Sequence, residues 1–506
     1  MSQINKNILA NVLGRGWSMF SVFIFIPIYI SILGVKMYGI ISFYAILQGV
    51  IIFVDAGLTA TLRRELAKGD DSNESRKSKY KILRSIEFLY FLIITALILC
   101  VFFSAEFIVG KWLNIEDLDL VATTRSIQIM GIALGLNFFS TLYQGGLLGL
   151  EKQVASNTLQ VLWGVLKNGG VILAVLFIGK TLIVFFLWQA ACNLVYVIVL
   201  RRILFGILKK KEPMVWLLSK DLLILRKVWK YATGMLIISI ISAINNQFDK
   251  FFISSTFSVS ELAIYTVSYS LAMVPIVIST PIAIAVFPRF VKYHSKSQNE
   301  KLYELFNNSF VLTLLLTASA GISLALNSSE FLLLWTQNTK ISMLAALPAA
   351  LLLIGQTLLS FQVIPFNLSI AIGDTKTIIK TGTCGIVLFI PLVIVLTKYY
   401  GIAGAAASWL LNSLIITPAL IVLIVKKATD FSLRTWILMN FVKPLLFISV
   451  GNFFFYLIKP ELDSNPIFGI LYVIVSSLII FLFSFKLMFR IKVKNTIKFI
   501  KNELFA

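Results

Sequence analysis

The chain has 506 residues, of which 58% are hydrophobic and 13% are charged, and its formal net charge is +22. This balance leaves too little polar surface to cover a water-soluble globule, so soluble enzymes and soluble nucleic-acid binders are excluded. One histidine and three scattered cysteines provide no multi-histidine metal site, histidine-based triad or disulfide framework. We therefore expect no metal and no cofactor.

Apolar runs follow one another with short polar gaps, which is typical of an all-α membrane protein that crosses the bilayer many times. The pattern predicts about fourteen transmembrane helices. In the first half they are 8–33, 39–60, 85–109, 124–149, 156–178, 181–200 and 231–256. In the second half they are 262–288, 305–328, 342–370, 378–397, 402–425, 437–458 and 467–489.

The basic residues test this order of helices, because Lys and Arg concentrate in cytoplasmic loops. With the N-terminus inside, the stretches 63–84, 201–230 and 289–301 and the tail from Arg490 fall on one side, and all of them are basic. We therefore predict a protein of the bacterial inner membrane with both termini in the cytoplasm. The positive charge then faces the anionic inner leaflet, and nucleic acid is not an expected partner.

Two predicted loops of the first half resemble two loops of the second half, and the two pairs are separated by nearly the same number of residues. GVKMYGIISF at 34–43 aligns with SVSELAIYTV at 258–267, and LLGLEKQ at 147–153 aligns with AIGDTK at 371–376. Two lobes of six helices would start on the same side of the membrane, as in parallel repeats. The expected domains are a six-helix lobe at 1–204, a basic cytoplasmic linker at 205–230, a second six-helix lobe at 231–425, and two extra helices with a basic tail at 426–506.

Cations inside the predicted spans are candidate functional residues, because a charge in the bilayer is costly. Arg15 lies one helical turn after Asn11 on the first span, and Lys167 lies near the middle of the fifth. Arginine offers a planar fork of donors that suits a phosphate. A structural salt bridge or a side chain that extends to the membrane surface is the alternative for Arg15.

The seventh span carries a second polar face, with Asn246 and Asp249 followed by Lys250. These groups could bind sugar hydroxyls, or Asp249 and Lys250 could form an ion pair that holds the lobe together. Asp249 and Asp55 are also candidates for ion coupling, although a helix-end role is the favoured interpretation of Asp55. Arg289 lies just after the inner end of the eighth span, where it could line an entrance or simply anchor the helix.

Several motifs, in their order along the chain, resemble a known family. They are LG…YG at 33–39, DAGL at 55–58, NNQFDKFFI at 245–253, VFPRF at 286–290 and YYGIAGAAAS at 399–408. This series is similar to the Wzx-like polysaccharide flippases of the multidrug, oligosaccharidyl-lipid and polysaccharide (MOP) exporter superfamily. The resemblance implies two pseudo-symmetric six-helix lobes of the MATE type. It also implies outward translocation of polyprenyl-diphosphate-linked oligosaccharides by alternating access, for O-antigen-like or capsule-like surface polysaccharides.

Two relatives within the superfamily remain alternatives. One is a cation-coupled multidrug antiporter, and the other is a lipid II flippase, which also has two extra C-terminal helices. An enzyme is not expected, because the longest predicted outer loop, at 110–123, contains no histidine, and no P-loop motif occurs in the chain. The implied partners are the undecaprenyl-diphosphate type of lipid-linked oligosaccharide and membrane lipids, and polysaccharide polymerase machinery could associate with the protein.

Overall fold

A computed structural model gives the fold. It describes residues 17, 21, 23–55, 57–67, 73–208, 243–428, 432–459 and 466–489. Every regular element in these residues is a helix, and three short segments among them are π-helical. The chain forms two compact units, Met1–Ala263 and Ile264–Ala506.

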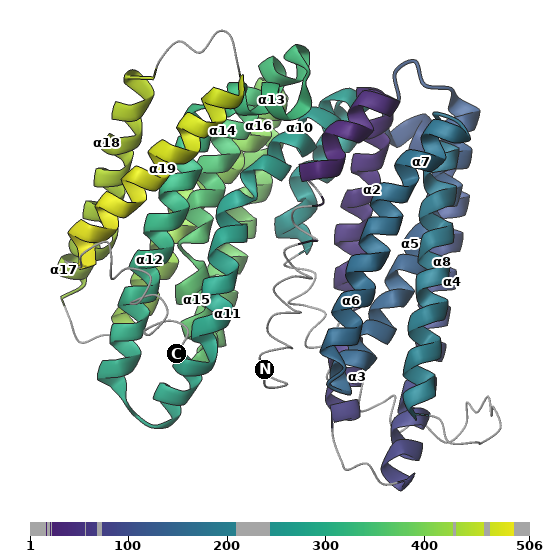
Figure 1. The fold of residues 1–506 in the computed structure, drawn as a ribbon, viewed down its shortest axis with the longest axis horizontal. Coiled ribbons are helices and arrows are strands. Elements are labelled where there is room, and N and C mark those ends of the chain that lie inside the picture. Colours follow the sequence, from purple (N-terminus) through teal and green to yellow (C-terminus); the bar gives the residue numbers. More distant parts are fainter. Residues whose placement is uncertain are drawn as a thin grey trace. The chain divides into compact units, whose positions relative to one another are not determined.

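The first unit is built around α5, which packs against α3, α4 and α8 (Figure 1). A Cβ atom at any of the five glycines of α5 would come within 3 Å of a neighbouring helix, so these glycines allow the close approach typical of membrane helices. The helices of this unit are Phe23–Leu33, α2 (Val35–Val54), α3 (Leu58–Ala67), α4 (Asn73–Phe107), η1 (Ile108–Trp112), α5 (Leu120–Gly149), α6 (Gln153–Gly164), η2 (Val165–Gly169), α7 (Gly170–Phe177), α8 (Leu182–Leu208) and the helical segment 243–256.

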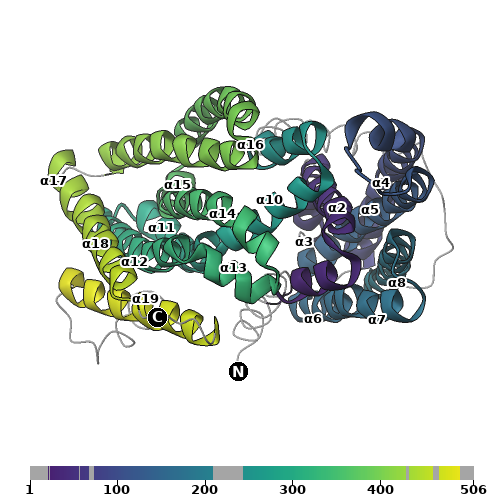
Figure 2. The same ribbon diagram turned by 90° about the horizontal axis from the view of Figure 1, so that it is seen from above.

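In the second unit, α12 packs against α11, α14, α18 and α19. Viewed from above, α18 and α19 lie on one side of α12 and the two arms of α16 lie on the other (Figure 2). The helices are α11 (Val274–Ser295), α12 (Asn299–Leu326), α13 (Ser328–Thr336), α14 (Thr339–Ser360), α15 (Val363–Ala371), α16 (Thr375–Ala428), α17 (Leu433–Ile437), η3 (Leu438–Val442), α18 (Lys443–Leu457) and α19 (Pro466–Phe489). α10 (Val259–Ala272) starts in the first unit and ends in the second.

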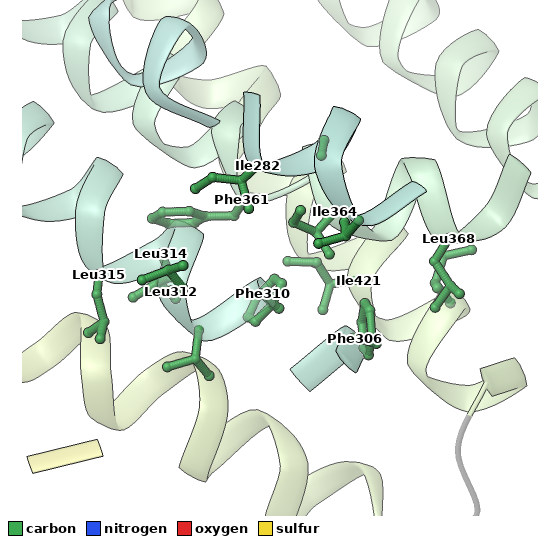
Figure 3. Packing of buried hydrophobic residues seen from close by; sticks show 14 of the residues in the cluster. Ile282, Phe306, Phe310, Leu312, Leu314, Leu315, Phe361, Ile364, Leu368 and Ile421 are labelled. Carbon is green, nitrogen blue, oxygen red and sulfur yellow. The ribbon is translucent and has the colours of Figure 1, made fainter. Parts of the chain in front are cut away.

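The core of the second unit contains several aromatic side chains. Phe306 and Phe310 of α12 and Ile421 of α16 belong to one buried cluster with Phe361, which lies between α14 and α15 (Figure 3). Trp436 of α17 stacks on Phe306 with ring centroids 5.8 Å apart, and its indole N–H donates to the Asn307 side chain. The two C-terminal helices are thereby joined to the lobe by the same apolar burial that holds its other helices together.

Helix α16 runs through two predicted spans, 378–397 and 402–425, and turns back on itself at Gly401. Gly401 has φ 61° and ψ −146°, a conformation that is essentially restricted to glycine. A Cβ atom at Gly404 would lie 1.9 Å from the carbonyl oxygen of Leu396, so the second arm packs directly on the first. The motif YYGIAGAAAS therefore encodes a tight helical hairpin.

Ten helices in the described part of the chain are long and apolar enough to cross a membrane. The predicted all-α, multi-pass membrane protein is confirmed, whereas the count of fourteen helices stays a prediction. The boundary between the two units falls within α10, and the predicted linker at 205–230 lies almost entirely outside the described residues. The predicted domain limits are therefore carried forward as predictions.

Candidate functional site

Lys167 lies in the π-helical turn η2, between α6 and α7. A π-helical turn shifts the backbone hydrogen bonds from their α-helical positions, and such turns are frequent at functional sites. Three side chains from other helices donate to carbonyl oxygens of this turn. They are Trp188 to Leu166 at 3.1 Å, Gln189 to Lys167 at 3.4 Å and Tyr29 to Asn168 at 2.8 Å. Neighbouring helices thus repair the irregular backbone inside the predicted membrane span.

An aromatic stack contacts the Lys167 side chain. Its Nζ lies 4.4 Å from the ring centroid of Trp163, and Trp163 stacks on Tyr196 of α8 at 4.7 Å with an angle of 11° between the rings. Gln144 of α5 donates to the Tyr196 hydroxyl. We call these four residues the Lys167 stack. Four neighbouring elements (η2, α6, α8 and α5) each contribute one member to it.

Asn193, which is fully buried, holds the stack in place. Its side-chain oxygen accepts the indole N–H of Trp163 at 3.2 Å, and its side-chain amide donates to the carbonyl of Ala133 at 2.8 Å. The orientation of the Trp163 ring, and with it the position of Lys167, is therefore fixed from α5 and α8.

Lys167 has no ion pair with a carboxylate in the part of the chain that the structure describes. The contact with the ring of Trp163 offsets part of the cost of placing this half-buried cation within a predicted span, by about 1 kcal/mol. A cation beside aromatic rings, a hydroxyl and an amide can bind a phosphate and the face of a sugar ring. The Lys167 stack is therefore our candidate site for an anionic, sugar-bearing ligand.

Asp249 and Lys250 form a buried pair on the helical segment 243–256. Their side chains are 0% and 4% exposed, and Lys250 Nζ lies 3.3 Å from Asp249 Oδ1. The same ammonium donates to the carbonyl of Asn246 at 2.9 Å. Of the two interpretations that the sequence left open for these residues, the ion pair is present in the structure, and sugar binding stays a prediction.

Asp55 caps a helix. Its Oδ1 accepts the backbone N–H of Thr59 at 3.2 Å and the Thr59 hydroxyl at 2.8 Å, at the start of α3. The hydroxyl of the buried Tyr90 donates to the same oxygen. These bonds match the helix-end role, and the ion-coupling role of Asp55 stays a prediction.

Three predicted site residues remain. Arg15 and Asn11 lie outside the described residues. Arg289 follows Pro288 on α11 in the second unit, where its side chain is half-buried.

Glu87 was not among the site residues predicted from the sequence. This buried carboxylate of α4 accepts the Tyr143 hydroxyl and Arg201 Nε at 2.7 Å each, and it also pairs with Arg84. The available signal was a glutamate inside the predicted span 85–109, three residues after an arginine.

The loop that follows η1 contacts the segment that leads into α10. Trp112 donates to the Ser254 hydroxyl at 3.0 Å, and Val259 N–H donates to the carbonyl of Asn114 at 3.0 Å. A Cβ atom at Gly39 would lie 2.0 Å from the carbonyl oxygen of Val259, so only a glycine fits where α2 meets α10. The start of α10 is thereby fixed against both α2 and the loop.

Residues 4–294 match the model of a family described as polysaccharide biosynthesis protein, which covers more than half of the chain. The chain belongs to the polysaccharide biosynthesis protein family. Residues 231–395 also match the MatE family model. The predicted membership of the MOP superfamily, with its transporter fold, is confirmed.

One curated relative of this chain is a putative O-antigen transporter of Shigella flexneri. The two are 23% identical over 390 residues, which is 74% of this chain and 87% of the relative. Among solved structures, the lipid II flippase MurJ in an inward closed conformation has a TM-score of 0.71 at 16% identity and covers 96% of this chain and 98% of its own. An inward-facing MATE multidrug resistance transporter has a TM-score of 0.66 at 13% identity and covers 86% and 99%. At these identities the structures show the fold alone.

Proposed function

We propose that this protein moves a polyprenyl-diphosphate-linked oligosaccharide from the cytoplasmic to the outer face of the bacterial inner membrane, for the synthesis of a surface polysaccharide. The observation that carries the proposal is Lys167, a cation held within a predicted membrane span by an aromatic ring, without a carboxylate partner among the described residues. A diphosphate supplies the missing negative charge, and the rings of Trp163 and Tyr196 suit the apolar face of a sugar.

Family membership supports the same substrate class, as does the name of the Shigella flexneri relative. In this proposal the lobes at 1–204 and 231–425 rock about a central cavity that opens first to the cytoplasm and then to the outside. The transport step requires no covalent chemistry. Both termini lie in the cytoplasm, and a polysaccharide polymerase at the outer face would consume the delivered unit.

Lipid II is the second candidate substrate. The MurJ structure covers 96% of this chain, against 86% for the MATE transporter, so the similarity to MurJ extends over more of the chain. Cation-coupled drug exchange is less well supported, because Asp249 is paired with Lys250 and Asp55 caps α3. An antiporter needs acids that exchange a cation, and these two already have partners.

The test is the sidedness of the lipid-linked oligosaccharide in cells depleted of this protein. We expect the intermediate to accumulate on the cytoplasmic face and to be cleared on re-expression of the wild-type protein. Lys167→Ala should fail to clear it, whereas the matched control Lys152→Ala, an exposed lysine in the turn before α6, should clear it. Accumulation of lipid II instead of the oligosaccharide would select the second candidate, and normal sidedness with altered drug tolerance would reject both.

A further inference from the structure

Beyond the Lys167 stack, a second group of charged residues lies where α4 and α8 pack together (Figure 1). Glu87, which is 7% exposed, accepts Arg201 Nε and the Tyr143 hydroxyl on one oxygen and pairs with Arg84 through the other. Two guanidinium groups thus share one carboxylate. The group keeps one net positive charge after its internal pairing.

An aromatic ring contacts both arginines. The guanidinium carbon of Arg201 lies 4.5 Å from the ring centroid of Phe205, and that of Arg84 lies 5.8 Å from it. Tyr80 packs against the same ring edge-on, with centroids 5.6 Å apart. We call Tyr80, Arg84, Glu87, Arg201 and Phe205 the Arg84–Arg201 cluster. Its ion pairs and cation–π contacts hold the two guanidinium groups in fixed positions, unlike those of an ordinary exposed arginine.

The cluster reaches the surface. The Arg201 side chain is 36% exposed and that of Arg84 is 12% exposed. Along α8, the exposed apolar residues Leu194 and Ile198 are followed one turn later by the exposed Arg202. An apolar stripe that ends in arginines is typical of a helix end at the level of the lipid headgroups.

We propose that the Arg84–Arg201 cluster binds the phosphodiester of an anionic phospholipid in the cytoplasmic leaflet. The hydrogen bond to Glu87 uses the Nε–H of Arg201, and a guanidinium carries four further N–H donors in the planar geometry that matches phosphate oxygens. A net positive site prefers a headgroup with net negative charge to a zwitterionic one, whose amine cancels its phosphate. The apolar stripe of α8 provides a surface for an acyl chain, which a soluble anion would not use.

The test is the thermal unfolding of the purified full-length protein in detergent, with added dioleoylphosphatidylglycerol or dioleoylphosphatidylcholine. We expect phosphatidylglycerol to raise the Tm of the wild type more than phosphatidylcholine does. Arg201→Gln should lose most of that difference. The matched control Arg125→Gln removes an exposed arginine from the far end of α5 and should retain it. Equal Tm values with the two lipids would overturn the proposal.

Arg201→Gln leaves the buried Glu87 with one partner fewer, so a second variant separates lipid binding from folding. In Arg84→Gln/Glu87→Gln/Arg201→Gln the carboxylate and both guanidinium groups are removed together, and we expect a folded protein that has also lost the phosphatidylglycerol effect. Retention of the full effect in this triple variant would assign the cluster a purely structural role and reject the lipid site. An equal rise in Tm with inorganic phosphate would assign the arginines to a soluble anion, which also overturns the proposal.

Discussion

The ammonium group of Lys167 lies over the ring of Trp163, and Asn193 accepts the indole N–H of that same ring. We therefore expect Trp163 to position the cation for the diphosphate. Trp163→Leu should slow translocation about fivefold, which corresponds to the loss of about 1 kcal/mol of cation–π interaction. The measurement is the rate at which a lipid-linked oligosaccharide becomes accessible outside proteoliposomes. Trp163→Phe keeps an aromatic face and should recover much of the rate, so equal rates for Leu and Phe would contradict this role.

Removal of the charge itself should have a larger effect. Lys167→Ala is expected to reduce export of the surface glycan at least about tenfold, because a charge-assisted bond to phosphate contributes about 1.5–3 kcal/mol. Arg15→Ala, in the predicted first span, is expected to act in the same direction. Membrane insertion of both variants, followed by protease accessibility, should match the wild type. Unchanged glycan export in both variants would remove the diphosphate assignment from these residues.

A substitution at Gly39 tests the contact between α2 and α10. Gly39→Ala places a methyl group 2.0 Å from the carbonyl oxygen of Val259, so the backbones must separate. We expect the free energy of unfolding to fall by about 1–3 kcal/mol, the usual cost of overpacking. Thermal unfolding in detergent measures the change. Gly206→Ala on α8 is the matched control, because a Cβ atom there has no neighbour within 4 Å, and an equal loss in both variants would show that the contact is unimportant.

The ion pair between Asp374 and Lys427 predicts that the stability of the folded protein depends on pH. The hydrogen bond from Lys427 at 2.6 Å holds the pKa of the Asp374 carboxyl below its ordinary value, with help from the Thr377 hydroxyl. Because the folded-state pKa is lowered, the stabilisation is complete above the unfolded value of about 3.9 and is lost as the pH falls through the folded value. The Lys427 side chain is 49% exposed, which limits the contribution to at most about 1 kcal/mol.

Asp374→Asn keeps the size of the side chain and removes its charge. The Tm of the wild type should exceed that of Asp374→Asn by a constant amount between pH 6 and 8, and the difference should shrink below about pH 4. A difference that is the same at pH 3 and pH 7 would assign the effect to helix capping and not to the charge.

The fold class could be predicted from the sequence because the bilayer imposes its thickness on each apolar run. The limits of 342–370 and 124–149 agree with the helical stretches Thr339–Ala371 and Leu120–Gly149 to within a few residues. The turn at Gly401 lies between the predicted spans 378–397 and 402–425. The division of the chain inside α10 could not be predicted, because it depends on contacts such as Gly39 with Val259, between residues that are far apart in the sequence.

The candidate site was predictable only in part. Lys167 was identified because a lysine inside an apolar run is costly, and Trp163 lies one turn before it on the same helix. Tyr196 and Gln144 come from α8 and α5, and no local spacing connects them to Lys167. The π-helical turn also had no signal in the sequence, since its carbonyl groups are bonded by Tyr29, Trp188 and Gln189 from other helices.

The hairpin at Gly401 also indicates where this turn of α16 lies relative to the membrane surface. Tyr399 and Tyr400, directly before the turn, are 79% and 69% exposed, and tyrosines in such positions collect at the membrane–water interface. The arm from Thr375 to Tyr400 is about 39 Å long, close to the thickness of a bilayer with its headgroup regions. The chain therefore reverses direction within the headgroup layer itself, and this face of the hairpin offers almost no loop to proteases, antibodies or inserted tags.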